Sequence, residues 1–165
     1  MFRHRLVVAN TEVRYFGNQL LAFYKSRHAI GASTHNGSES RLNRVANFAA
    51  GVRVLVHGAE SQIHALGILS AEKATEVLRT AVVEGTWNDE EVATGAKIPL
   101  RLVYRTLDYF HCFVKPINLA DLGWSPDYKP INGTICEMPD GQKAEDIWQK
   151  AVDLALLEIR AALLK

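Results

Sequence analysis

The side chains of this 165-residue chain that could perform covalent or acid–base chemistry are scattered rather than grouped. Cys112 directly follows His111. Because successive side chains of a strand point to opposite faces, these two cannot form a nucleophile–base pair with each other. Ser33 and His35 fit hydrogen bonding within a loop, and the acidic run at 89–91 is typical of a solvated loop. The sequence therefore predicts no catalytic residue.

Motifs for cofactors and metals are missing as well. The chain has no Walker-type glycine loop, no GxGxxG turn and no GxSxG elbow. The six histidines are dispersed, and Cys112 lies 24 residues from Cys136, which fits neither a zinc site nor a disulfide framework. We therefore expect no metal and no cofactor, and we expect any catalysis to reside in a separate domain or partner.

A basic stretch rich in Ser, Thr and Asn, from Lys25 to Arg44, carries residue types that contact nucleic acid. Lysine and arginine pair with phosphates, and small polar side chains contact phosphates and base edges. The N-terminus of a following helix would add a site for a phosphate. The candidate nucleic-acid contacts are Lys25, Ser26, Arg27, Ser33, Thr34, His35, Asn36, Arg41, Asn43 and Arg44.

The charge distribution is also compatible with binding to nucleic acid, but it does not show such binding by itself. The net charge is +1, but residues 1–58 hold eight Lys and Arg against two acids, so the remainder is acidic. A basic half of a near-neutral protein suggests one face that meets a polyanion. Scattered, solvated charge explains the asymmetry equally well.

Aromatic side chains in polar segments could wall a pocket for a base. Trp87 and Trp124 lie in segments where a large ring is hard to bury, so they either line a pocket or pack. For the tyrosines packing is the better interpretation, and Trp148 is expected in the core. The candidate pocket residues are Tyr24, Ala32, Ser33, His57, Trp87 and Trp124.

Hydrophobic periodicity predicts the elements that must position these residues. Strands are expected at 5–9, 52–56, 63–69, 98–105 and 109–115, the second and third forming a hairpin. Helices are expected from Ser38 or Ser40 to Gly51, at 71–83 and at 142–165, with a short helical turn ending the stretch 115–122. Polar loops are expected at 26–40 and 84–97, and a loop or edge segment at 123–141. The stretch 13–25 is ambiguous between helix and strand.

Length and composition indicate a single domain over residues 1–165. With 48% apolar and 22% charged residues, the chain has the composition of a soluble globular protein. No apolar run approaches the roughly 20 residues of a membrane span, and no signal peptide is evident, so we expect a cytoplasmic protein that does not engage a membrane. The fold class expected is α+β: five or six strands in a small barrel or strongly bent sheet, with helices outside.

Several short motifs resemble a known family when taken in order. Residues Phe23–Asn43, with their "KS", "ST" and "RLN" steps, resemble the opening of YTH domains. Gly51–His57 and Ile63–Glu72 look like the central hairpin shared by YTH and EVE domains. Val114–Leu122 is similar to the "PI.L..L" passage of EVE domains. The chain thus resembles the EVE and YTH domains of the PUA-like superfamily over roughly Leu20–Leu122.

This resemblance implies a PUA-like bent barrel with flanking helices and a C-terminal helix. It also implies a non-enzymatic reader that binds nucleic acid, DNA being favoured, and holds one flipped, modified base in an aromatic pocket. Such domains serve as specificity modules of modification-dependent restriction systems, including McrB-type proteins. The partner expected on that basis is an AAA+ GTPase or a nuclease, as a linked domain or a separate chain.

One position departs from the family pattern. YTH domains place a pocket tryptophan just before the "ST" step, where this chain has Gly31 and Ala32. Either another residue, such as Trp87, supplies the wall, or the pocket accepts a base other than N6-methyladenine. The small residues are also compatible with a roomier pocket, so the identity of the base is left open.

Two other function classes remain. A protein-interaction module would use the helix at 142–165 to dock on a partner. A small enzyme acting on RNA or nucleotides on a PUA-like scaffold would need a carboxylate, histidine or lysine with a shifted pKa in its pocket.

Overall fold

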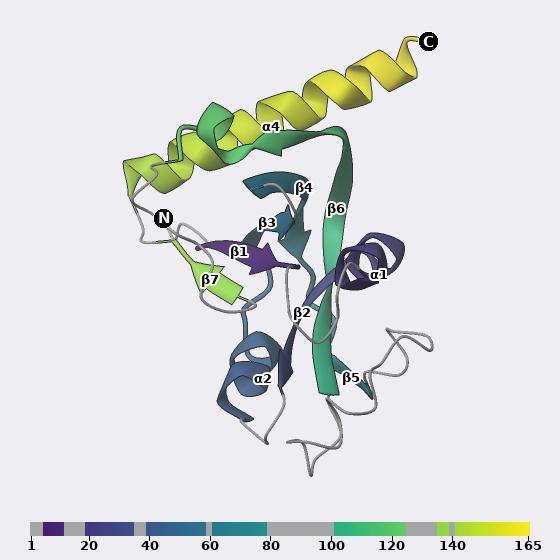
Figure 1. Ribbon diagram of the computed structural model, residues 1–165, viewed down its shortest axis with the longest axis vertical. Helices are drawn as coiled ribbons and strands as arrows, with labels where there is room; N and C mark the ends of the chain where they lie inside the picture. The colour runs from purple at the N-terminus through teal and green to yellow at the C-terminus, as the bar shows by residue number, and fades with distance from the viewer. Residues whose placement is uncertain are drawn as a thin grey trace.

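One curled sheet runs through the computed structural model, which describes residues 5–11, 19–34, 39–58, 61–78, 101–124, 135–138 and 141–165. Its strands are β1 (Leu6–Asn10), β2 (Ala29–Thr34), β3 (Arg53–Gly58), β4 (Gln62–Leu69), β5 (Thr75–Leu78), β6 (Arg101–Asn118) and β7 (Ile135–Glu137). The helices are α1 (Gln19–Arg27), α2 (Glu39–Ala46), the 3-10 turn η3 (Leu119–Leu122) and α4 (Gln142–Leu163). The strand order is β2-β6-β4-β3-β1-β7, with β5 also paired to β6 (Figure 1). The predicted α+β class with a strongly bent sheet is confirmed.

Strand β6 is the longest strand and organises the sheet. Residues 101–106 pair with β2, and residues 101–104 also pair with β5. The later part pairs with β4 and then bends across the top of the molecule toward η3 (Figure 1). Register shifts in the β4–β6 pairing mark the irregularities that permit this bend. Residues 101–105 of the first predicted strand and the whole of the strand predicted at 109–115 are therefore parts of one strand.

The centre of the sheet follows the local sequence closely. Strands β3 and β4 form the predicted antiparallel hairpin. Strand β1 runs parallel to β3, and β7 closes the edge beside β1. All five residues of β1 are buried, as expected for an apolar strand that is covered on both faces.

Two of the predicted segments were wrong. Residues 26–40, expected to be a polar loop, contain the end of α1, the whole of β2 and the start of α2. Residues 71–83, expected to be a helix, contain strand β5. In both segments the pairing with β6, which is remote in sequence, outweighs the local preference.

The sheet separates two hydrophobic clusters. Alternate residues of β1 show this: Val7 and Ala9 join one cluster, whereas Leu6 and Val8 join the other. The first cluster lies under α1 and includes Leu20 and other α1 residues. The second lies under α4.

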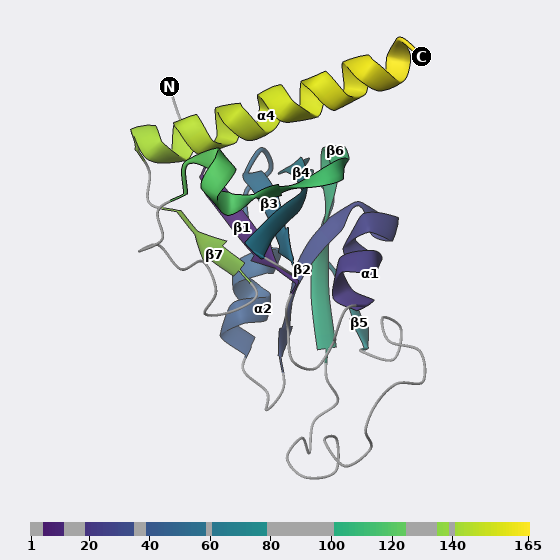
Figure 2. The same cartoon turned by 45° about the horizontal axis from the view of Figure 1, so that its top comes forward.

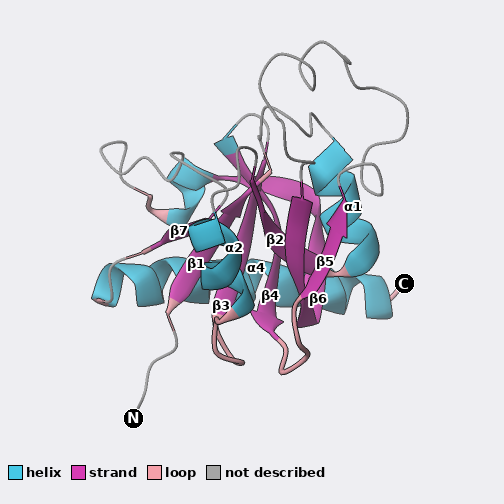
Figure 3. Ribbon diagram, turned by 90° about the horizontal axis from the view of Figure 1, so that it is seen from below, coloured by secondary structure: helices cyan, strands magenta, loops and turns pink. Residues whose placement is uncertain are grey.

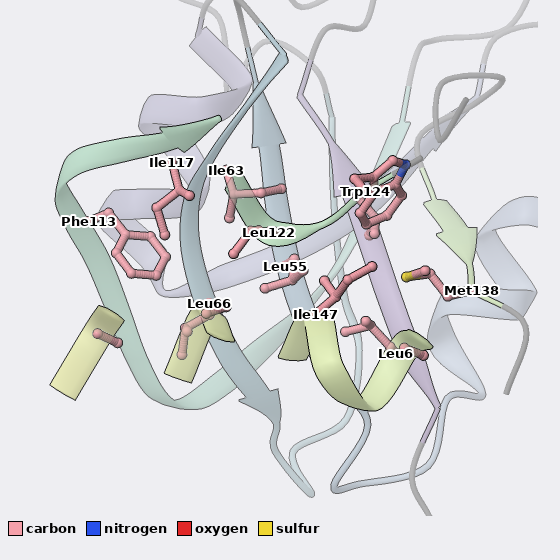
Figure 4. Packing of buried hydrophobic residues seen from close by; sticks show 14 residues of the cluster. Leu6, Leu55, Ile63, Leu66, Phe113, Ile117, Leu122, Trp124, Met138 and Ile147 are labelled. Atoms are coloured by element: carbon pink, nitrogen blue, oxygen red, sulfur yellow. The ribbon is translucent and has the colours of Figure 1, made fainter. Parts of the chain in front are cut away.

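Helix α4 covers the second cluster and crosses the top of the molecule (Figure 2). Its buried stripe is Ala144, Ile147, Ala151 and Ala155. The small alanines let the helix approach the sheet closely. Beneath it pack Leu6, Leu55, Ile63, Leu66, Phe113, Ile117, Leu122, Trp124 and Met138 (Figure 4). The predicted terminal helix is confirmed, and Trp148 is partly buried against the same cluster.

Candidate nucleic-acid interface

Strands β2, β5 and β6 share one end of the sheet. Thr34, the last residue of β2, and Leu78, the last of β5, both pair with Arg101, the first of β6. Strands β2 and β5 end where β6 begins (Figures 1 and 3), so the connections 35–38 and 79–100 follow this end in the sequence. We call it the strand-end face and define it by the backbone of Ser33, Thr34, Leu78, Arg101 and residues 39–44.

The strand-end face brings together half of the predicted nucleic-acid contacts, namely Ser33, Thr34, Arg41, Asn43 and Arg44. Asn43 and Arg44 are exposed on α2. The side chains of the other three lie outside the described residues, as do His35, Asn36 and Trp87 altogether. Ser33 and Thr34 belong to a strand and not to the predicted loop, so their backbone is fixed by pairing with β6.

Helix α2 is attached to this end by a small apolar cluster. Leu42 and Val45 are buried against Ala32 of β2 and Val103 of β6. In the sequence, Leu42, Val45 and Ala46 have the spacing of one helix face, and this is the face that packs. The helix ends at Ala46, before the predicted stop at Gly51.

A buried arginine fixes the other end of α2. Arg105 of β6 is only 4% exposed, and its guanidinium donates to backbone carbonyl oxygens on both sides of it. The acceptors are Phe48 at 2.7 Å, Glu72 and Ser70 at 3.0 Å, and Val45 and Ala46 at 3.3 Å. The positive charge also complements the C-terminal end of the helix dipole. Burial lowers the pKa of Arg105, but a guanidinium stays charged in a protein.

The predicted contacts on α1 form a second, separate group. Lys25, Ser26 and Arg27 occupy its last turn, where Ser26 and Arg27 are exposed. The Arg27 guanidinium lies 5.5 Å from the ring centroid of Phe23, at cation–π distance. In Figure 1 strands β2 and β6 separate α1 from α2. The predicted basic surface is thus divided between two helices.

Four of the predicted pocket residues are buried, which corrects their assignment as pocket walls. The Tyr24 hydroxyl donates to the Gly31 carbonyl at 2.9 Å, and burial raises the pKa of this phenol strongly. Ala32 packs against α2. His57 is fully buried in β3, with its Nδ1 3.1 Å from Oδ1 of Asn10.

Trp124 is the clearest of these corrections. It is 6% exposed and packs in the cluster beneath α4, so of the two interpretations left open for it, packing is correct (Figure 4). A ring in a polar-looking segment is buried because a helix that begins at Gln142 covers it. Of the other predicted pocket residues, Trp87 and the side chain of Ser33 lie outside the described residues.

The small residues at 31 and 32 are explained by packing. A Cβ atom on Gly31 would lie 2.5 Å from the Val103 carbonyl oxygen, closer than real contacts allow. Ala32 is fully buried. A tryptophan at either position would therefore collide with β6 or α2, so these small residues do not by themselves indicate the roomier pocket that the sequence leaves open as an alternative.

Part of the basic excess near the N-terminus is neutralised by acids of the C-terminal part. Arg5 and Arg44 each lie 3.2 Å from Oε2 of Glu137, and Arg53 lies 2.9 Å from Oε1 of Glu145. Three of the eight bases counted in residues 1–58 are therefore ion-paired, so the charge available to a polyanion is smaller than the sequence count suggests. Arg5 and Arg44 share the carboxylate of Glu137 and remain exposed.

Sequence reasoning missed an aromatic group beside α1. Tyr109 of β6 is 86% exposed, and the next residue, Phe110, stacks on the ring of His28 at 4.7 Å. The alternation in the sequence 109–115 indicated a strand but not which ring would leave the sheet. A positive φ at Tyr109, which reflects a backbone irregularity, was not predictable from that alternation.

Two hollows lie along α4, away from the strand-end face. One of about 500 Å³ is lined by Phe113, Lys115, Pro116, Ile117, Asp121, Lys150, Asp153, Leu154, Leu157 and Glu158. Another of about 470 Å³ lies beside η3. Within the first, Glu158 accepts from His111 Nε2 at 2.8 Å and from the N–H groups of Val114 and Lys115. Its bonds anchor the bend of β6 to α4.

The described part of the chain offers little reactive chemistry. Cys112 and Cys136 are free, and burial raises the pKa of the Cys112 thiol, with nearby Lys25 opposing this. Among the described residues, no group of three His, Cys, Asp or Glu side chains could hold a metal ion. The described helices include none that is long and apolar enough to cross a membrane.

Comparison with solved structures identifies the architecture. The N-terminal domain of Staphylothermus marinus McrB superimposes with a TM-score of 0.52 at 9% identity, over 88% of this chain and 93% of that one. The chain has a PUA-like fold. At this identity the similarity shows the fold alone, and it confirms the fold that the sequence motifs implied.

Other comparisons give weaker similarities. ASCH from Zymomonas mobilis gives a TM-score of 0.48 at 13% identity, over 90% of this chain and 94% of that one. Protein Atu2648 from Agrobacterium tumefaciens gives 0.39 at 9% identity, over 87% and 90%. No family model matches the chain, and no curated protein matches it.

Proposed function

We propose that this chain is a nucleic-acid reader, with DNA favoured, that holds a single flipped, modified base. In this proposal it is the specificity domain of a modification-dependent restriction system, and an AAA+ GTPase or nuclease, linked or separate, performs any cleavage. The fold shared with the N-terminal domain of a McrB protein supports this choice among nucleic-acid functions.

The observation that supports the proposal most is the common origin of two connections. Residues 35–38, which include His35 and Asn36, and residues 79–100, which include Trp87, both start from the strand-end face. In this proposal the two connections bring polar side chains for a base edge and a flat ring for stacking to the same end of the sheet. A base reader needs both.

Helix α2 supplies the phosphate side of this arrangement. Asn43 and Arg44 are exposed on it, and its first residues adjoin the end of β2. The hydrogen bonds from Arg105 hold the end of α2 against the sheet, so the positions of Asn43 and Arg44 on this helix are fixed. Such contacts orient a nucleic acid without reading its sequence.

The test is filter binding of methylated and plain oligonucleotides over a salt series. Replacing Trp87 by Ala should reduce the preference for the modified base by about 5- to 150-fold, the range for loss of one base–aromatic stack. Trp148→Ala, on α4, is the matched control and should leave that preference unchanged. Equal, negligible binding of all oligonucleotides by the wild type at low salt would refute the proposal.

A second pair of variants separates phosphate contacts from base recognition. Arg44→Ala should weaken all oligonucleotides alike and reduce the salt slope by about one. Lys150→Ala removes one exposed charge from α4 and should change neither quantity. If Arg44→Ala changed only the preference for the modified base, Arg44 would be a base contact instead.

A protein-interaction function has one observation in its favour. The last turns of α4 expose Leu156, Leu157, Leu163 and Leu164, which are 57–78% accessible. Apolar side chains exposed on one element are common at interfaces with another protein. Light scattering over a concentration series tests this, because a self-associating chain gains mass and a monomeric reader does not.

A further inference from the structure

The backbone conformation of Tyr109, and not packing of its side chain, places the ring at the surface. Its side chain is 86% exposed, yet its φ is +53°, a left-handed value that non-glycine residues seldom adopt. A large exposed ring has no packing reason to be held in such a conformation. Strained, exposed residues of this kind are concentrated at binding sites.

A bulge between β4 and β6 produces this conformation. Leu66 pairs with His111 and Ile68 pairs with Asp108, so Gly67 alone stands opposite Tyr109 and Phe110. A Cβ atom on Gly67 would lie 3.1 Å from Cβ of Leu107, so the close approach of the two strands here favours glycine. The extra residue turns the Tyr109 side chain out of the sheet.

The residue that follows Tyr109 in the chain, Phe110, packs partly against the first cluster and joins β6 to the end of α1. Phe110 stacks on His28, with the rings 4.7 Å apart and inclined by 14°. His28 is exposed and also has a positive φ, of +50°, and its carbonyl accepts from the Leu107 N–H at 2.7 Å. The strained turn at the end of α1 is thereby joined to β6 just before the bulge.

The charges of this region are mostly positive. Lys25 and Arg27 lie in the last turn of α1, just before His28, and Asp108, exposed beside Tyr109, is the adjacent acid on β6. Flat rings interleaved with Lys and Arg are the composition that binds single-stranded nucleic acid, since bases stack on the rings and phosphates pair with the cations. A peptide partner would not require this combination.

We propose that Tyr109 and the His28–Phe110 stack form a platform for unpaired bases of a single DNA strand, flanked by Lys25 and Arg27. The choice of DNA rests on the proposed function. Tyr109 follows Arg101 along β6 by about 26 Å at roughly 3.3 Å per residue, so the platform lies apart from the strand-end face. It would engage the strand that flanks the base being read.

The experiment measures the anisotropy of labelled, unmodified dT12, which does not depend on recognition of a modified base. Tyr109→Ala should weaken binding by about 5-fold or more, the lower limit for loss of one base–aromatic stack. Tyr109→Phe keeps the ring and should bind within about 2-fold of wild type by the same reasoning. Val114→Ala, at a side chain that is 87% exposed on the same strand, is the matched control. Equal binding by Tyr109→Ala and Tyr109→Phe overturns the proposal.

A stability measurement tells whether the Tyr109 side chain serves binding or stabilises the fold. Tyr109→Gly relieves the positive φ, so its urea midpoint should equal or exceed that of wild type, while binding of dT12 should weaken as in Tyr109→Ala. A lower midpoint with unchanged binding would make Tyr109 a packing residue and overturn the proposal. Tighter binding of rU12 than of dT12 would overturn the choice of DNA. Loss of preference for a modified duplex base, with dT12 binding intact, would refute the proposed function alone.

Discussion

The two ends of strand β6 are stabilised in different ways. At the α4 end, the strand bends over a cluster that includes Phe113, Ile117 and Trp124, and the carboxylate of Glu158 accepts from its backbone. At the strand-end face, it pairs with the ends of β2 and β5, and Arg105 fixes α2 through backbone carbonyls. At the α4 end, the aromatic rings are therefore buried in the hydrophobic core.

This difference separates structural residues from candidates for recognition. A ring beneath α4 cannot meet a base without removal of the helix, whereas Asn43 and Arg44 at the strand-end face are exposed and can contact a ligand without any change in the core. The following predictions test whether the two ends are as distinct as their contacts indicate.

Trp124→Ala should give the largest loss of stability. A buried tryptophan replaced by alanine costs about 3–5 kcal/mol, through lost burial and the cavity left behind. Urea unfolding measures the loss, with Trp148→Ala, at a partly buried ring, as the smaller control. Trp124→Phe, which should remain folded, is expected to keep any preference for a modified oligonucleotide. A change in that preference would place Trp124 in the recognition site and remove the distinction between the two ends.

Arg105→Met should give the next largest loss. Methionine replaces the stem but leaves the carbonyl groups of Ser70, Glu72 and the end of α2 without their donor. Only the bonds to Val45 and Ser70 are fully buried, and a buried acceptor left unsatisfied costs about 1–3 kcal/mol, so we expect a loss of roughly 3 kcal/mol in urea unfolding. Arg160→Met, at an exposed arginine of α4, should change stability by less than about 0.5 kcal/mol. An equal loss of stability in the two variants would mean that the packing of α2 does not depend on the hydrogen bonds from Arg105.

Patterns that are local in the sequence predicted the fold well. The alternation of Val52, Val54 and Val56 identified the central hairpin, and a stretch without Gly or Pro identified the terminal helix. These elements have their determinants within a few residues of each other. The order of short motifs was enough to indicate the PUA-like fold.

Features that depend on remote partners could not be predicted. Residues 29–34 read as a loop because Ala, Gly and Ser are poor strand formers, and they become a strand only by pairing with β6. The sequence leaves Trp124 open between a pocket and packing because the helix that buries it comes later in the chain. The ion pairs of Glu137 with Arg5 and Arg44 join opposite ends of the sequence, so a charge count alone overstated the basic surface.

The α4 end should also be the more sensitive of the two to acid, through Glu158. Burial raises the pKa of this carboxyl, but the bonds from His111 and from the N–H groups of Val114 and Lys115 outweigh it, so the folded pKa lies below the ordinary value of 4.5. A group with a lowered folded pKa stabilises the fold above its unfolded pKa, and this contribution is lost as the pH falls through the folded value.

Glu158→Gln should therefore destabilise the protein at pH 7, with a deficit that shrinks below about pH 4.5, where wild type loses the same contribution. We expect the smallest effect of the three here, because the side chain is partly solvated and such pairs contribute little. Urea midpoints from pH 7 to pH 3.5 measure it. Asp153→Asn, which removes an exposed carboxyl of the same helix, should run parallel to wild type over this range. If both variants lost the acid dependence equally, the charge of α4 as a whole, and not the Glu158 anchor, would set the acid response of this end.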